Sequence, residues 1–391
     1  MKKKTIGARL VLEDGSEFVG WSFGKARSQA GEVVFTTGMT GYPQSLTDPS
    51  YRGQILVATY PLIGNYGVPL VPRTQEPYFD DAGIPVHFES GRIQAAGFVV
   101  AEACDAPSHY SSESTLSLWL ERNGVPGLQG IDTRALTERL REHGVMRGKI
   151  LVEGSRDVTY DSGDSQHPVA DVSIDAVKVY PARGDRAAAG TAAGEATGAS
   201  TKTGKAKRIV LVDCGAKANI LRCLLARGVE VIRVPWNHDL KTLQYDGIFL
   251  SNGPGDPKAC GKTIATLRRA MADDKPIFGI CLGNQIMALA AGADTYKLPY
   301  GHRGQNQPCS EVGTQRCYIT SQNHGYAVRG DTLPQGWEPW FVNANDGTIE
   351  GIRSTKAPFS AVQFHPEGCP GPRDTEFLID AFIRQVKGGA K

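Results

Sequence analysis

The chain has 391 residues, of which 40% are hydrophobic and 21% are charged, with 43 Lys and Arg against 41 Asp and Glu. The formal net charge of +2 favours neither a nucleic acid nor an anionic membrane as a partner. No run of 18 apolar residues occurs, so we expect no transmembrane helix. The length favours two or three domains over one.

The first half of the chain predicts a mixed α/β domain over residues 1–182. Residues 8–12 and 17–21 read as two strands of a hairpin that turns at Glu13-Asp14-Gly15-Ser16. Further strands are expected at residues 31–36, 54–59 and 95–100. Asp132 is expected to cap a helix, rather than act as a catalytic acid, and this helix should end by Gly144.

Residues 183–207 are rich in Ala, Gly, Thr and Lys and include no large apolar residue. Such a segment cannot bury enough surface to offset its ordering entropy, so it predicts a flexible linker. We therefore expect a second domain over residues 208–391.

The second half predicts a doubly wound α/β domain with a mainly parallel sheet. Its short apolar runs are typical of buried strands and alternate with helical patterns. The expected strands are 208–212, 229–234, 247–250 and 276–280, and the expected helices are 218–227 and 263–272. Because sites in such sheets lie beyond the carboxyl ends of the strands, residues that follow these strands are candidates for function.

Cys281 follows the strand 276–280 and precedes a helical pattern. Gly279 and Gly283 flank it at positions −2 and +2, as small residues do in a nucleophile elbow. A thiol at a helix N-terminus is favoured as thiolate, and the next backbone N–H can face an oxyanion. The alternative is a buried structural cysteine beside a tight turn.

His365 ends an alternating strand, and Glu367 follows it beyond Pro366. Residues two apart on extended backbone share a face, so Glu367 can reach the ring of His365. A catalytic thiol needs such a base and an acid to orient it. Taken alone, this pattern is as often structural.

A rigid turn, Ser-Asn-Gly-Pro-Gly-Asp-Pro at residues 251–257, follows another strand. Its backbone amides could bind substrate and supply a second oxyanion donor. By itself it is more typical of an ordinary loop.

The order of glycine turn, cysteine elbow and His-x-Glu resembles the triad-type (class I) glutamine amidotransferases, and Ser-Gln-Asn-His-Gly-Tyr at 321–326 fits the same pattern. The first half adds motifs that other amidotransferases lack, at residues 37–42, 46–51, 60–67 and 130–134. With them, nearly the whole chain except the linker is similar to the small subunit of carbamoyl phosphate synthetase.

This resemblance implies that Cys281 attacks L-glutamine, that His365 moves the protons and that Glu367 orients His365. It also implies a set of residues that hold glutamine or its oxyanion: Ser50, Gly253, Gly255, Leu282, Gln285, Asn323, Gly325 and Tyr326. Because Ser50 belongs to the first domain, we expect the site at the domain boundary. The ammonia would pass to a large synthetase subunit that makes carbamoyl phosphate for arginine and pyrimidine biosynthesis.

No cofactor or metal is expected in this chain, because it has no Gly-x-x-x-x-Gly-Lys phosphate loop and no metal-ligand spacing among its eight cysteines. ATP, Mg²⁺ and bicarbonate are expected on the large subunit. Lys2, Lys3 and Lys4 are followed by no apolar signal segment, which predicts a cytoplasmic protein with reduced thiols.

Three features depart from the family pattern. Asn284 and Gln307 stand where the family often has histidine, and the linker is longer than usual. His302 and His324 lie in polar segments and are expected to be structural. The alternatives are a different amidotransferase or amide hydrolase with the same triad, or a weakly active subunit that only stabilises its partner.

Overall fold

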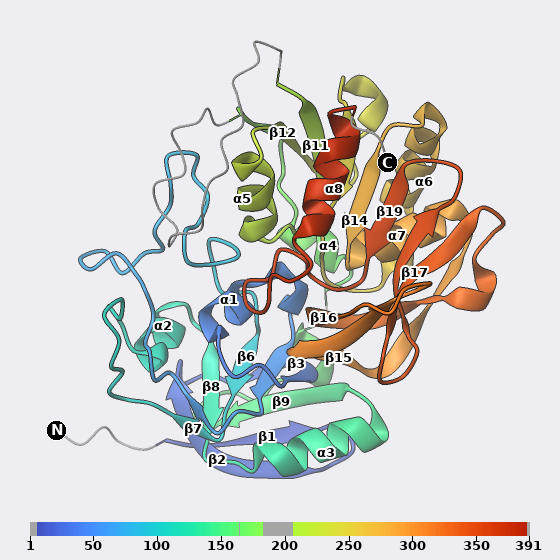
Figure 1. Ribbon diagram of the computed structural model, residues 1–391. Helices are drawn as coiled ribbons and strands as arrows, with labels where there is room; N and C mark the ends of the chain where they lie inside the picture. Colours follow the sequence, from blue (N-terminus) through green and yellow to red (C-terminus); the bar gives the residue numbers. More distant parts are fainter. Residues whose placement is uncertain (1–5, 164, 183–205, 389–391) are drawn as a thin grey trace.

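The computed structural model describes residues 6–163, 165–182 and 206–388 (Figure 1). Within the first half, the described residues form a closed barrel with the strand order β1-β2-β8-β6-β4-β3-β9. Its strands are β1 (Gly7–Leu12), β2 (Glu17–Gly24), β3 (Gln29–Thr36), β4 (Ile55–Ala58), β6 (Gly97–Val99), β8 (Pro126–Gln129) and β9 (Met146–Val152). The hairpin of β1 and β2 and the strands β3, β4 and β6 confirm the sequence predictions, with small differences at their ends.

Short helices and a small strand pair surround the barrel. They are α1 (Tyr42–Thr47), η1 (Pro49–Tyr51), β5 (Leu62–Ile63), β7 (Glu102–Ala103), α2 (Leu116–Arg122), α3 (Thr133–His143) and η2 (Tyr160–Gly163). Helix α4 (Pro168–Val172) instead packs against the second half, where Val169 joins the apolar core of the sheet. The carboxylate of Asp132 accepts hydrogen bonds from the backbone N–H groups of Arg134 and Ala135 at 3.0 and 2.9 Å. This cap and the end of α3 at Gly144 confirm the predicted helix.

The second half is built on a large twisted sheet whose centre is parallel. The parallel strands, in spatial order, are β12 (Glu230–Pro235), β11 (Arg208–Asp213), β13 (Gly247–Leu250), β14 (Ile277–Ile280) and β19 (Phe359–Val362). Helices α5 (Ala218–Ala226) and α8 (Phe377–Val386) share one apolar core with this sheet. Helices α6 (Gly261–Ala270) and α7 (Leu282–Ala291) share the core on the other face, which confirms the doubly wound arrangement. Short 3₁₀ turns complete this half: η3 (Leu240–Thr242), η4 (Pro257–Ala259), η5 (Met271–Asp273) and η6 (Gly330–Thr332).

An antiparallel extension of this sheet was not predicted. Beyond β19 the order continues through β18 (Ile349–Ser354), β16 (Cys317–Arg329), β15 (Asp294–Glu311) and β17 (Trp337–Asn343). The pairing of β15 with β16 shifts register between Lys297 and His302 and again between Gly304 and Gln307. These irregularities break the period-2 pattern from which a strand is recognised.

Strand β10 (Lys178–Tyr180) precedes the expected linker but pairs antiparallel with β12 at the edge of the second sheet. Residues just before 183 therefore pack with the second half of the chain. Residues 183–205 of the expected linker lie outside the described residues.

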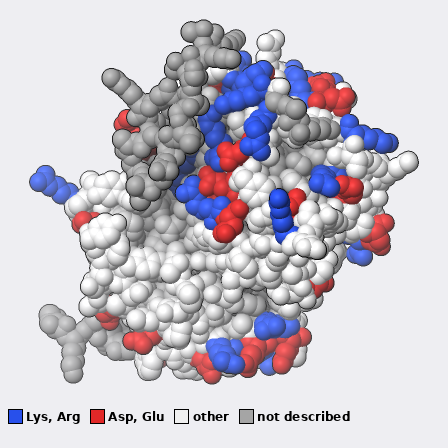
Figure 2. Space-filling model, in the orientation of Figure 1, with Lys and Arg blue, Asp and Glu red and all other residues white. Residues whose placement is uncertain are grey.

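Contacts between the barrel and the second half include β3, the residue that follows it, and β15. The backbone N–H of Thr37 donates to the carbonyl of Arg303 at 3.2 Å, and Lys297 forms an ion pair with Glu32 at 2.8 Å. On the face in Figure 2, Lys and Arg are interspersed with Asp and Glu, and a broad uncharged area separates two charged regions. None of the helices in the described part of the chain is both long and apolar enough to span a membrane.

Candidate active site

Cys281 is the single residue between β14 and α7, and its backbone has the unusual angles φ 54° and ψ −104°. A positive φ is strained for a residue with a side chain and persists only where the surroundings enforce it. Gly279 and Gly283 allow this turn, because a Cβ on Gly279 would lie 2.7 Å from the backbone of Gly283, and a Cβ on Gly283 would lie 2.6 Å from the carbonyl oxygen of Leu250. The sequence-predicted elbow is therefore present.

His365 and Glu367 follow β19, the strand next to β14. Nδ1 of His365 lies 2.7 Å from Oε1 of Glu367, so the ring donates to the carboxylate. No described group hydrogen-bonds to the buried Nε2 of His365, although an interaction with the Cys281 side chain acts on its ionisation. A long or poorly aligned hydrogen bond between a nucleophile and its base is common before substrate binds. The three predicted residues lie together and are almost fully buried.

The charges of His365 and Glu367 stabilise each other. Burial would lower the pKa of His365, but the Glu367 carboxylate and the interaction with Cys281 raise it to about 10. Burial would raise the pKa of Glu367, but the charges of Lys217 and His365 lower it to about 2. The structure therefore favours an imidazolium next to a fixed carboxylate.

Lys217 lies beneath the pair and was not anticipated from the sequence. Its Nζ lies 3.0 Å from Oε1 of Glu367 and donates to the carbonyl of Gly368 at 2.5 Å. Glu367 and its neighbours raise the pKa of Lys217 against the effect of burial, so its charge is retained. The available signal was its position shortly after β11, at the carboxyl edge of the parallel sheet.

The glycine turn lies against the elbow. A Cβ on Gly253 would lie 2.8 Å from Cδ2 of Leu282, the first residue of α7. Beside it, Nδ2 of Asn252 donates to the hydroxyl of Ser50 at 2.8 Å and to Asp48 at 3.3 Å. Ser50 therefore reaches the site from the barrel, as predicted, and Asn252 and Asp48 are additions to the predicted set.

A cavity of about 900 Å³ opens above Cys281 between the two halves of the chain. All of the residues expected to hold glutamine line it except Leu282: Ser50, Gly253, Gly255, Gln285, Asn323, Gly325 and Tyr326. The thiol of Cys281 lies 3.6 Å from the carbonyl oxygen of Asn323 at the edge of this cavity. The residues that the sequence predicts to bind glutamine thus surround one cavity at the boundary between the two halves, and their binding of glutamine stays a prediction.

Two amide side chains in the cavity have fixed orientations. Nε2 of Gln285 donates to the carbonyl of Tyr326 at 2.8 Å, and Nδ2 of Asn323 donates to Oδ2 of Asp48 at 3.1 Å. Both partners can only accept, so the nitrogens are assigned by chemistry. The amide oxygens of Gln285 and Asn323 are left as acceptors for a ligand.

The two departures from the family pattern lie away from the cavity lining. Asn284 is fully buried, and its Nδ2 donates to Oε1 of Gln363 at 3.1 Å, an oxygen that also accepts from Gln285. Gln307 lies in β15, where its carbonyl accepts from the hydroxyl of Thr320 at 2.9 Å. Asn284 therefore acts on the site through Gln363 and Gln285 rather than by touching a ligand.

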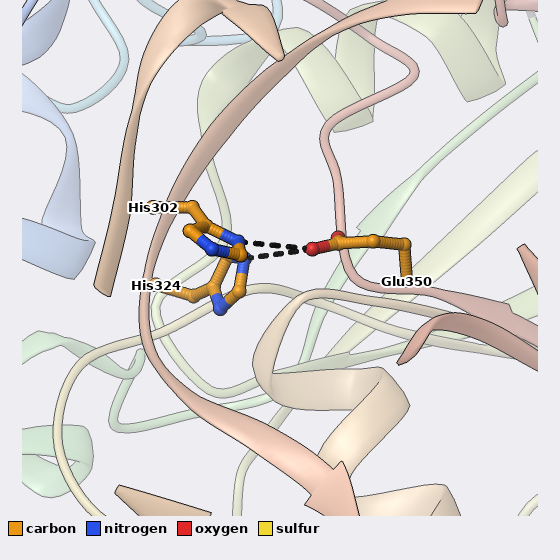
Figure 3. Close-up of side chains that lie close together, drawn as sticks. All are labelled: His302, His324 and Glu350. Carbon is orange, nitrogen blue, oxygen red and sulfur yellow. Dashed lines mark hydrogen bonds and ion pairs between the residues drawn. The ribbon is translucent and has the colours of Figure 1, made fainter. Parts of the chain in front are cut away.

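His302 and His324 form a buried cluster with Glu350 (Figure 3), and His324 also borders the cavity. Oε1 of Glu350 lies 3.0 Å from Nδ1 of His302 and 3.6 Å from Nε2 of His324. Glu350 and Asp346 raise the pKa of His302 against the effect of burial, whereas burial lowers the pKa of His324. Because His324 lies between Asn323 and Gly325 in the sequence, the cluster supports the strand that lines the cavity.

The same three side chains have the atom types and spacing that could hold a metal ion, with their ligand atoms within 4.8 Å of one another. The other ring nitrogen of each histidine faces an acceptor, Asp346 for His302 and the carbonyl of Tyr326 for His324. Hydrogen bonds and charge attraction within the cluster account for this arrangement without an ion.

Comparisons with known proteins agree with the two halves of the chain. Residues 10–150 match the family "Carbamoyl-phosphate synthase small chain, CPSase domain", and residues 210–385 match "Glutamine amidotransferase class-I". Multifunctional protein pyr-3 of Neurospora crassa is 47% identical over 398 residues, which are 96% of this chain and 21% of that protein. Multifunctional protein URA2 of Saccharomyces cerevisiae is 47% identical over 404 residues, 98% of this chain and 18% of that protein.

A human relative, named carbamoyl-phosphate synthase [ammonia], mitochondrial, is 44% identical over 388 residues, which are 99% of this chain and 24% of that protein. The chain thus spans about a fifth of the length of these relatives. With a small-chain domain first and a class I amidotransferase domain second, the chain belongs to the carbamoyl-phosphate synthase small-chain family.

Proposed function

We propose that the chain is the glutaminase component of a glutamine-dependent carbamoyl phosphate synthetase. The observation that carries this proposal is the buried set of Cys281, His365 and Glu367 at an elbow beneath a cavity lined by both halves of the chain. The small-chain domain supports this synthetase over other users of ammonia.

In the proposed reaction, the sulfur of Cys281 attacks the side-chain amide carbon of L-glutamine. His365, which already holds the thiol's proton as an imidazolium, gives it to the amide nitrogen, which leaves as ammonia, and a thioester remains. Water then attacks the thioester, with His365 taking its proton, and glutamate leaves as the thiol re-forms. Glu367 keeps the imidazole oriented and stabilises its charge throughout.

Each tetrahedral intermediate carries an oxyanion that needs hydrogen-bond donors. The N–H of Leu282 is suited to this role, because the first N–H groups of a helix have no partner within the helix. Gly253 packs against Leu282 and would supply the second donor. Ser50, Gly255, Gln285, Asn323, Gly325 and Tyr326 would hold the remainder of the substrate.

The ammonia would pass to a large synthetase subunit that binds ATP, Mg²⁺ and bicarbonate, and its product would serve arginine and pyrimidine biosynthesis. The fungal relatives are single multifunctional chains, so a heterodimer and a covalent fusion are both compatible with this role. A cytoplasmic location is supported by all eight cysteines being free.

The main competing function is a weakly active subunit that stabilises an ammonia-dependent synthetase. The human relative is named for ammonia, so this alternative has a specific basis. The retained cysteine, its elbow and its histidine favour hydrolysis. A different amidotransferase or amide hydrolase remains as the other alternative, and the small-chain domain counts against it.

The experiment is an assay of glutamate release from glutamine, followed by reconstitution with a candidate large subunit. We expect the isolated chain to release glutamate from glutamine, and to release it faster with the large subunit present. In the complex with Cys281→Ser, glutamine-dependent formation of carbamoyl phosphate should be lost, whereas ammonia-dependent formation should be retained. Unchanged glutamine hydrolysis in Cys281→Ser would refute the mechanism. Turnover of other amides at equal rates would favour the hydrolase.

A further inference from the structure

Arg303 is a buried cation that the mechanism above does not use. It is only 5% exposed, yet it lines the same cavity as Cys281. Its position in β15 is directly opposite Asn323 in β16. Residues paired across an antiparallel ladder point to the same face, so Arg303 and Asn323, which both line the cavity, share one face of the ladder. The adjacent pair, His302 and His324, is on the opposite face, where its side chains contact Glu350.

The guanidinium lies against backbone that also borders the cavity. Its Nη1 donates to the carbonyl of Tyr300 at 2.5 Å. A Cβ on Gly325 would lie 3.2 Å from Nη2, so the group fits beside Gly325 because that residue has no side chain. Cys281 is among the groups that act electrostatically on the pKa of Arg303, and both residues line the cavity.

The charge of Arg303 is not compensated by the groups around it. Throughout the described residues, no hydrogen-bond partner lies within reach of its Nε, and no carboxylate lies within 4.0 Å of its guanidinium. The nearby Glu32 is already bound by Lys297 at 2.8 Å and by Gln54 at 2.8 Å. Burial accordingly lowers the pKa of Arg303 more than its neighbours raise it. An arginine keeps its charge in proteins, and a buried charge without a partner is unfavourable.

We propose that Arg303 binds the α-carboxylate of glutamine and thereby selects glutamine over amides that lack this group. This inference rests on the proposed glutaminase function. The cavity then complements both charges of the substrate: the amide oxygens of Gln285 and Asn323 accept from the α-ammonium, and Arg303 donates to the α-carboxylate. A planar guanidinium matches a carboxylate in geometry as well as charge.

The test compares three amides in the full chain: glutamine, 4-aminobutanamide, which lacks the α-carboxylate, and glutaramic acid, which lacks the α-amino group. Wild type should hydrolyse glutamine with a much higher kcat/KM than either analogue. In Arg303→Met, kcat/KM for glutamine should fall about 10- to 200-fold, as for loss of a hydrogen-bonded charge. This variant should no longer prefer glutamine over 4-aminobutanamide, but it should still prefer glutamine over glutaramic acid.

Arg52→Met is the matched control, because Arg52 also lines the cavity but is already paired with Asp171 at 3.9 Å. It should keep both preferences. If Arg303→Met does not give a cooperative unfolding transition, Arg303→Lys is measured in its place. Arg303→Lys should show a reduced preference for glutamine over 4-aminobutanamide.

An unchanged ratio between glutamine and 4-aminobutanamide in a folded Arg303 variant would overturn the assignment of Arg303 while leaving glutaminase activity standing. Absence of glutamine hydrolysis in wild type would instead overturn the proposed function.

Discussion

The ammonium of Lys217 lies 3.0 Å from the carboxylate of Glu367, and neither side chain is more than 3% exposed. Glu367 therefore contacts two cationic groups, Lys217 and His365, and both contacts are made by its Oε1. The carboxylate stays charged despite its burial because of this double contact. The segment after β19, which carries His365, is thus linked electrostatically to the loop after β11.

Replacing Lys217 with methionine should leave a buried carboxylate without one of its partners. We expect the free energy of unfolding to fall by about 3–5 kcal/mol, and kcat for glutamine hydrolysis to fall with it because His365 loses a fixed partner. Denaturant unfolding and steady-state kinetics measure the two effects. Lys258→Met is the control, because its ion pair with Asp294 is half-exposed and should contribute at most about 1 kcal/mol. Equal stability losses in both variants would contradict the structural role of Lys217.

The glycines of the elbow should tolerate no side chain. In Gly283→Ala, the new Cβ would lie 2.6 Å from the carbonyl oxygen of Leu250, so the turn at Cys281 must shift. We expect a stability loss of about 1–3 kcal/mol and near-complete loss of glutamine hydrolysis. Gly261→Ala, at the start of α6 with no heavy atom within 4 Å of its Cβ, is the control and should leave both unchanged. An active Gly283→Ala would show that the backbone at Cys281 needs no such constraint.

Asp48 should set the geometry of the cavity from the barrel side. Its carboxylate accepts from the backbone N–H of Ser50 at 2.9 Å and from the side chains of Asn252 and Asn323. In Asp48→Asn, one oxygen becomes an N–H₂ group that faces a donor. We expect KM for glutamine to rise about tenfold, with a smaller change in kcat, by loss of about 1–2 kcal/mol of binding. Asp239→Asn, an exposed carboxylate paired with Arg269, should not change KM.

The contribution of His365 and Glu367 to stability should depend on pH in both directions. The folded pKa of His365 is raised from 6.5 to about 10, so its stabilisation is complete below pH 6.5 and is lost as the pH rises towards 10. The folded pKa of Glu367 is lowered from 4.5 to about 2, so its stabilisation is complete above pH 4.5 and is lost as the pH falls towards 2.

The difference in Tm between wild type and Glu367→Gln should therefore be largest between about pH 4.5 and 6.5 and should shrink on either side. Thermal unfolding across this pH range measures it. A difference in Tm that stays constant with pH would mean that the pair is not charged in the folded protein.

The sequence predicted those parts of the site that depend on local backbone. The turn at Cys281 follows from the two glycines that flank it. The contact of His365 with Glu367 was predicted from extended backbone, but the structure makes it in a turn that the hydrogen bond from the N–H of Gly368 to the carbonyl of His365 closes at 3.1 Å. The approach of Cys281 and His365 to each other follows from the adjacency of β14 and β19, which a doubly wound sheet makes plausible.

The remaining residues depend on packing between distant segments. Lys217, Asp48 and Arg303 come from three separate parts of the chain, and no spacing along the sequence brings them to one site. The strands β15 to β18 were missed because register shifts and glycines interrupt their alternation. Arg303 was consequently not singled out, although it pairs with Asn323 and lines the same cavity.

The edge strand β10 should keep the two halves of the chain associated after proteolytic cleavage between residues 183 and 205. Residues 178–180 are hydrogen-bonded to β12, so the segment before residue 183 is already held by the second half. Cleavage between residues 183 and 205 should therefore give a nicked protein whose two fragments co-elute and keep glutaminase activity. Fragments 1–182 and 206–391 expressed together should likewise assemble, which would make this region a suitable place to attach a label without disturbing the cavity.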